Sequence, residues 1–170
     1  AYASRETMSA EGEFKTLVKE LHKAGIECIP EMYFTGKELP GEILSVLRYW
    51  VEEYHVDGFH LTGFPDLSLA AEDPFLKRTK LFAENWNDVM NRRPKQGYVT
   101  PGDGAVSVEE KNLAEYNMQF MEDMRRFLKG DEGMLSAFEL RNRRNPMEYA
   151  VINYMANTNG FTLMDTVSYD

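Results

Sequence analysis

The apolar residues of this chain alternate between two spacings, one typical of helices and one typical of buried strands. A helix that begins at Ser9 and ends at Gly25 is predicted by an apolar stripe at positions i, i+3, i+4 and i+7, namely Phe14, Leu17, Val18 and Leu21. The mostly apolar run 26–34 follows and predicts a strand covered on both faces. Pro30 weakens that assignment because proline cannot donate a hydrogen bond to a sheet.

The same alternation continues toward the end of the chain. Pro40 and Gly41 open a second helix, whose apolar face reaches Tyr54. After it the pattern predicts strands at 56–61, 79–83, 112–117 and 150–156, and helices at 118–130 and 133–143. Segments 64–74 and 91–107 are predicted as loops, the first with at most two helical turns. Helices that alternate with short apolar strands indicate an α/β domain with a parallel sheet of four or five strands.

Composition narrows the function classes. The chain has 170 residues and a formal charge of −9, which argues against binding to nucleic acid or to an anionic membrane. It lacks both an apolar stretch of ~20 residues and a signal-peptide core, so a cytoplasmic location is expected. The lone Cys28 lies in an apolar run and is interpreted as a buried hydrophobe. The histidines have no partners at metal-ligand spacing, so no metal or other cofactor is predicted.

Five segments, in order along the chain, resemble one enzyme family. They are 13–27 (EFKTLVKELHKAGIE), 49–59, 79–87 (TKLFAENWN), 115–130 and 151–169. Together they resemble the α-amylase superfamily, glycoside hydrolase family 13, and within it the glycogen-debranching, isoamylase and pullulanase branch. The resemblance implies a (β/α)8 TIM-barrel fold, of which residues 1–170 cover about strands 3 to 7. The chain is then a partial barrel domain, expected to belong to a longer polypeptide or to need a partner that covers its sheet edges.

The family's mechanism requires an aspartate nucleophile, a glutamate acid/base and an aspartate that stabilises the transition state. Matched position by position, the resemblance places the acid/base on Glu84, which is retained. The other catalytic positions are substituted: the nucleophile falls on Thr62, the arginine two residues before it on His60, the third-strand aspartate on Glu31, the stabilising aspartate on Asn159, and the histidine before that on Thr158. A retaining glycosidase needs two carboxyl groups about 5 Å apart, so a single retained carboxylate does not support double displacement.

Several roles stay open from the sequence. Glu84 is either a working acid, a relic or a hydrogen-bonding group for a sugar, and either Glu31 or Asp66 is a candidate for a replacement second carboxylate. His60 is interpreted as a hydrogen-bonded structural group. Four aromatic residues near strand tips either stack on sugar rings or belong to the core: Trp86, Tyr33, Phe34 and Phe64.

The favoured hypothesis is therefore a glycosidase-like barrel segment that has lost standard hydrolysis and binds α-glucan or serves as structural support. The alternative is an active hydrolase of α-1,6 branches that uses Glu84 with an unusual second carboxylate. A third possibility is an assembly module whose cleft binds nothing.

Overall fold

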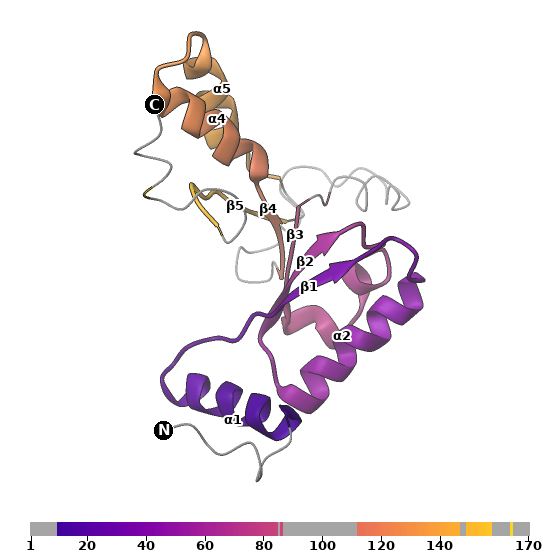
Figure 1. Ribbon diagram of the computed structural model, residues 1–170. Coiled ribbons are helices and arrows are strands. Elements are labelled where there is room, and N and C mark those ends of the chain that lie inside the picture. The colour runs from indigo at the N-terminus through magenta and orange to yellow at the C-terminus, as the bar shows by residue number, and fades with distance from the viewer. Residues whose placement is uncertain (1–9, 85, 87–111, 147–148, 158–163, 165–170) are drawn as a thin grey trace, which may run out of the picture.

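The computed structural model describes residues 10–84, 86, 112–146, 149–157 and 164. It is an α/β arrangement in which helices alternate with strands (Figure 1). The helices are α1 (Ala10–Lys23), α2 (Pro40–Tyr54), α4 (Met118–Lys129) and α5 (Met134–Asn142), with two 3₁₀ helices at Ala70–Glu72 and Phe75–Arg78. The strands are β1 (Glu31–Phe34), β2 (Gly58–Gly63), β3 (Lys80–Ala83), β4 (Leu113–Tyr116) and β5 (Ala150–Ile152).

The five strands form one sheet in which each strand pairs with the next one along the chain, and every pair is parallel. A doubly wound fold reverses its strand order near the middle of the sheet, whereas successive strands of a (β/α)8 barrel stay in sequence. The described residues therefore form part of a TIM-type barrel, as the sequence predicted.

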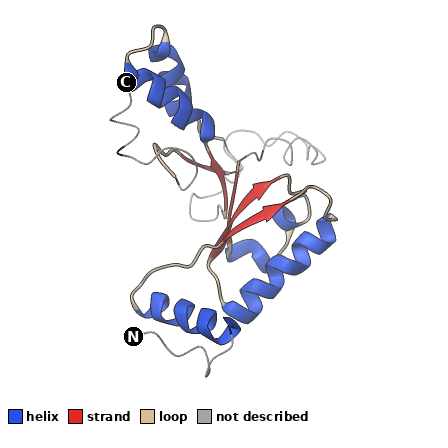
Figure 2. Cartoon of the chain, viewed as in Figure 1, coloured by secondary structure: helices blue, strands red, loops and turns tan. Residues whose placement is uncertain are grey.

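Helices cover one face of this sheet. Ile43 and Leu47 of α2 pack in a single apolar core with Phe59 and Leu61 of β2 and Leu81 of β3. Helix α2 lies beside β1 and β2, α1 lies near the end of α2, and the α4–α5 hairpin lies at the other end of the molecule (Figures 1 and 2). No described helix is long and apolar enough to cross a membrane.

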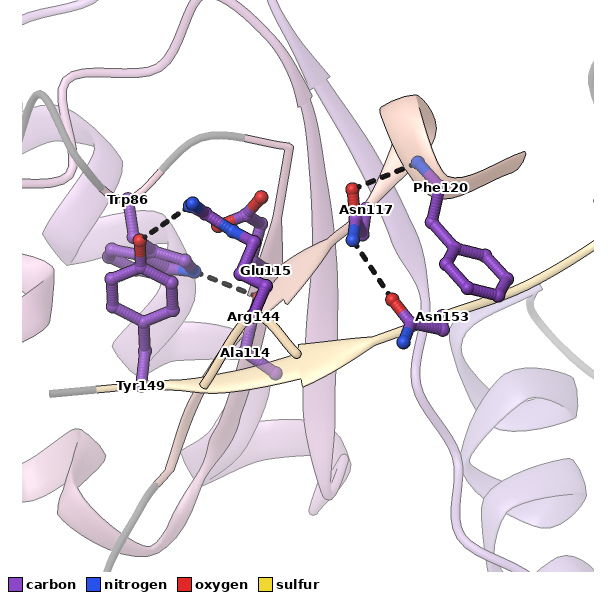
Figure 3. Close-up of polar contacts among 8 residues, drawn as sticks. All are labelled: Trp86, Ala114, Glu115, Asn117, Phe120, Arg144, Tyr149 and Asn153. Carbon is purple, nitrogen blue, oxygen red and sulfur yellow. Dashed lines mark hydrogen bonds and ion pairs between the residues drawn. The ribbon is translucent and has the colours of Figure 1, made fainter. Parts of the chain in front are cut away.

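Polar contacts join β4 to its neighbours on this side of the sheet (Figure 3). The indole N–H of the fully buried Trp86 donates to the Ala114 carbonyl at 2.9 Å. The Arg144 guanidinium donates to the Glu115 carboxylate at 2.6 Å and to the Tyr149 hydroxyl at 3.0 Å. Because Glu115 is buried, this arginine compensates a charge that would otherwise be costly at that depth.

A second contact fixes the carboxyl ends of β4 and β5. The Asn117 side chain accepts a hydrogen bond from the Phe120 backbone N–H at 3.1 Å and so caps α4. Its amide donates to Asn153 Oδ1 at 2.9 Å (Figure 3). One asparagine thus orients both the helix that leaves β4 and the segment that follows β5.

The observed boundaries correct some predictions. The strand prediction for 26–34 is wrong before residue 31, because Pro30 has no N–H and the segment joins its neighbours only through single contacts, such as Asp57 N–H to the Cys28 carbonyl at 2.9 Å. The last strand ends at residue 152 instead of 156. Strand β2 runs two residues further than 56–61, which places Thr62 and Gly63 inside the strand. The predicted loop at 91–107 lies outside the described residues.

We expect Leu47→Ala to lower the free energy of unfolding by about 2–5 kcal/mol, because it leaves a cavity where a fully buried side chain packs against the sheet. Leu128→Ala is the matched control, since Leu128 is 63% exposed, and should change stability by less than about 0.5 kcal/mol. Urea denaturation of both variants in the longest natural form of the polypeptide measures the difference. Equal losses would show that α2 does not anchor the core.

Candidate functional site

The face of the sheet opposite the core residues carries the positions that the sequence singled out. Register pairs Glu31 with His60 and Tyr33 with Thr62, so these four side chains emerge on one face, and Tyr116 of β4 shares it. In a (β/α)8 barrel the helices lie outside, which makes this the interior. We call this surface, defined by Glu31, Tyr33, His60, Thr62 and Tyr116, the inner face.

Thr62 is the residue that the sequence resemblance matched to the family's nucleophile. Its side chain is only 8% exposed, and its hydroxyl donates a long hydrogen bond of 3.4 Å to the Met32 carbonyl on β1. An alcohol becomes a strong nucleophile when a neighbouring base accepts its proton. A peptide carbonyl is not such a base, so this contact holds Thr62 as a structural group.

His60 lies two residues earlier on the same strand, and Glu31 holds it. Its Nδ1 is 3.4 Å from Glu31 Oε2, and its ring centroid is 4.4 Å from that of Tyr116. The other ring nitrogen, Nε2, is buried and has no hydrogen-bond partner among the described residues. Nor does the described part of the chain contain a group of three His, Cys, Asp or Glu residues that would hold a metal ion. These contacts favour a packing role for His60.

Tyrosines fill the inner face beyond His60. The rings of Tyr116 and Tyr154 stack with centroids 4.2 Å apart. Burial, together with the neighbouring Tyr116 and the negative charges of Glu84 and Glu122, raises the pKa of Tyr154 to about 12. Burial and the charge of Glu31 also raise the pKa of Tyr116. Both phenols therefore stay protonated near neutral pH, and neither supplies a phenolate as a nucleophile.

Glu84 is exposed and follows β3 directly, at the carboxyl edge of the sheet. Glu31 lies two strands away and two register positions lower, which by ordinary sheet spacing separates the two Cα atoms by about 12 Å. This Cα separation does not exclude the ~5 Å between carboxyl groups that retaining chemistry needs, because each glutamate side chain extends several ångströms from its Cα. The contact that the structure does show for the Glu31 carboxylate is with His60, at 3.4 Å.

Asp66 follows the tip of β2 and is half-buried. Its Oδ1 accepts a hydrogen bond from the Ser68 backbone N–H at 3.1 Å, which is the contact of a turn-forming aspartate. Thr158 and Asn159, the remaining substituted positions, lie outside the described residues.

The four aromatic candidates separate into two groups. Trp86 and Phe34 belong to the apolar core, and neither offers a free ring face to a sugar. Tyr33 and Phe64 are 68% and 76% exposed, at the carboxyl ends of the neighbouring strands β1 and β2. Strand alternation explains the division of Tyr33 from Phe34, because adjacent residues point to opposite faces of a sheet.

Gly63 and Glu38 fix the backbone at the carboxyl ends of β1 and β2. The sequence did not predict this role for either residue. Gly63 has a φ of +82°, and a Cβ there would lie 2.1 Å from the Phe34 carbonyl oxygen and 2.8 Å from the Tyr33 ring. The Glu38 carboxylate accepts hydrogen bonds from the backbone N–H groups of Thr35 and Gly36, which holds the loop after β1. The exposed rings thus stand on a tightly fixed backbone. The signal in the sequence was a glycine directly after Thr62, at the end of a predicted strand.

Comparison with known proteins gives relatives along the whole chain. Isoamylase 3, chloroplastic, of Oryza sativa subsp. japonica is 29% identical over 100% of this chain and 29% of its own length. A glycogen debranching enzyme of Serratia proteamaculans is 29% identical over 99% of this chain and 34% of its own length. A glycogen operon protein GlgX homolog of Haemophilus influenzae is 27% identical over 93% of this chain and 32% of its own length. No protein-family model matches, and neither does any solved structure.

The chain spans about a third of the length of these curated relatives. The predicted resemblance to the isoamylase and glycogen-debranching branch of the α-amylase superfamily is confirmed.

We expect Gly63→Ala to destabilise the fold more than Gly130→Ala. Both glycines have positive φ, of +82° and +88°, so both alanines incur about 1–2 kcal/mol of backbone strain. Only the Cβ at residue 63 meets other atoms, and this should add at least about 2 kcal/mol. Urea denaturation compares the two variants. Equal losses would mean that the tips of β1 and β2 are less tightly packed than described.

Proposed function

We propose that this chain, which resembles isoamylase and glycogen-debranching enzymes along its full length, is part of a glycosidase-like barrel that binds α-glucan without retaining hydrolysis. The observation that carries the proposal is Thr62. It stands at the nucleophile position as a buried hydroxyl that donates to a backbone carbonyl.

The chemistry around Thr62 supports the loss of hydrolysis. Glu84 can donate a proton, but the anomeric carbon then needs a second group to attack it or to activate a water. Among the described residues, Glu31 is held by His60, and the pKa values of Tyr116 and Tyr154 are raised. The match of Asn159 to the stabilising aspartate removes a further negative charge that would favour an oxocarbenium-like transition state.

Glucan binding requires less than hydrolysis does. Tyr33 and Phe64 present exposed rings at the same sheet edge as Glu84, and an aromatic face packs well against the C–H surface of a pyranose. The names of the relatives connect them to glycogen and to isoamylase activity. Glu84, which is exposed there, is then a hydrogen-bond acceptor for sugar hydroxyls.

The same resemblance suggests a longer protein. β1 and β5 are the outer strands of the described sheet, and a barrel has no outer strands. We propose that further strands, from the same polypeptide or from a partner, pair with these edges. Support of such a larger assembly is a second role that is compatible with glucan binding.

The alternative function is hydrolysis of α-1,6 branches by Glu84 with a non-standard second carboxylate. The retention of an exposed glutamate at the acid/base position favours it. Asp66 is the nearest candidate along the chain, because it follows the tip of β2 by only a few residues.

We expect no release of reducing ends from glycogen or from branched maltooligosaccharides by the longest natural form of the polypeptide. Glu84→Gln and Asp66→Asn variants should give the same background, because the parent has no turnover to lose. The measurement is a reducing-sugar assay over several hours beside an active debranching enzyme. Turnover in the parent that Glu84→Gln abolishes would establish the alternative function instead.

We expect Tyr33→Ala and Phe64→Ala each to weaken glucan binding by about tenfold, since each removes the apolar area of one ring. Native gel electrophoresis with and without embedded glycogen measures the retardation. Phe75→Ala is the control, because Phe75 is a 48%-exposed aromatic residue that lies before β3, at the opposite end of the strands. If glycogen slows the migration of all three variants equally, Tyr33 and Phe64 do not contact the glucan.

A further inference from the structure

A cavity of about 620 Å³ lies between α1 and α2, away from the inner face. Its lining comes from α1 and from the end of α2, including His55. In Figure 1, α1 and the end of α2 lie at the amino ends of β1 and β2. The cavity that these helices line is therefore at the opposite end of the strands from Thr62 and Glu84. A volume of this size suits a small metabolite.

The lining is strongly basic for a chain whose net charge is −9. Lys15, Lys19 and Lys23 line it, as do His22 and His55. A single lining residue, Glu53, is acidic. Acidic partners outside the lining offset part of this charge, because Glu20 pairs with Lys23 and Asp57 pairs with His22. Lys19 is the lining lysine that is left to attract a small anion.

The ion pairs at this cavity are exposed and exchangeable. Lys15 Nζ is 3.0 Å from Glu53, and Lys23 Nζ is 2.6 Å from Glu20, with the side chains about half exposed in both pairs. Exposed pairs of this kind contribute little net stability, so an incoming anion competes with them at small cost. Lys19 is exposed and makes no ion pair within the described residues.

The floor of the cavity differs from its rim. Val18 and Tyr54 are buried there, and the Lys15 ammonium lies over the Tyr54 ring, 5.3 Å from its centroid. An apolar floor beneath a cationic rim accommodates an anionic group together with a compact body such as a sugar ring.

We propose that this cavity binds a small phosphate dianion, either free or as the phosphate of a hexose phosphate, with Lys19 and Lys23 as its principal contacts. The site is separate from the inner face and does not depend on whether the chain binds glucan. Ammonium groups bind phosphate as point charges through charge-assisted hydrogen bonds.

Thermal unfolding and isothermal titration calorimetry with inorganic phosphate and with glucose 6-phosphate test the proposal, at an ionic strength held constant with NaCl. We expect saturable binding that Lys19→Glu weakens by at least about tenfold, because one favourable charge becomes a repulsive one. Lys129→Glu is the matched control, since Lys129 is likewise an exposed lysine near the end of a helix, α4, but far from the cavity along the chain. It should leave the affinity unchanged.

The two ligands separate the sources of the phosphate. If glucose 6-phosphate binds more tightly than inorganic phosphate, the sugar contacts the apolar floor. If the two affinities are equal, the site recognises the phosphate group alone. Absence of saturable binding by either ligand, or equal weakening by Lys19→Glu and Lys129→Glu, would overturn the proposal. Both lysines are exposed, so neither variant removes a core contact.

Discussion

The parallel register of the five strands is the constraint on which the rest of the molecule depends. Since side chains alternate along a strand, this register sends Phe59, Leu61 and Leu81 to the helices and His60 and Thr62 to the inner face. A shift by one residue would place a histidine in the apolar core. The buried Trp86 and the Arg144–Glu115 pair strengthen the same register on the side of β4.

The strand register also determines which side chains lie on the inner face. His60 and Tyr116 come from strands that do not pair directly, yet their rings are 4.4 Å apart, and Tyr154 extends the stack. A TIM barrel fills its interior with layers of side chains from alternate strands in the same way. The result is a stack of rings in which burial raises the pKa values of Tyr116 and Tyr154, beside a polar contact between His60 and Glu31.

Sequence alone predicted the helices and the parallel sheet well, because their apolar spacing is regular. The predicted strand at 26–34 was wrong for residues 26–30, because the apolar run predicts a strand there but Pro30 cannot donate a hydrogen bond to the sheet. The placement of Trp86 in the core and of Phe64 outside it could not be decided, since both are aromatic residues near strand tips. The close approach of Gly63 to the Tyr33 ring requires coordinates, because the two residues lie 30 positions apart in the sequence, on different strands.

Hydrolysis and binding depend on the site in different ways. Retaining hydrolysis needs several groups at once, and removal of one of them abolishes most of the rate. Binding is a sum over contacts, of which each ring or carboxylate supplies a part. Under the proposed match of Thr62 to the nucleophile, the site would lack a group that hydrolysis requires. It would still offer Glu84 and the exposed rings of Tyr33 and Phe64 as contacts for binding. This asymmetry is why we assign the strand tips to recognition of a glucan chain and not to its cleavage.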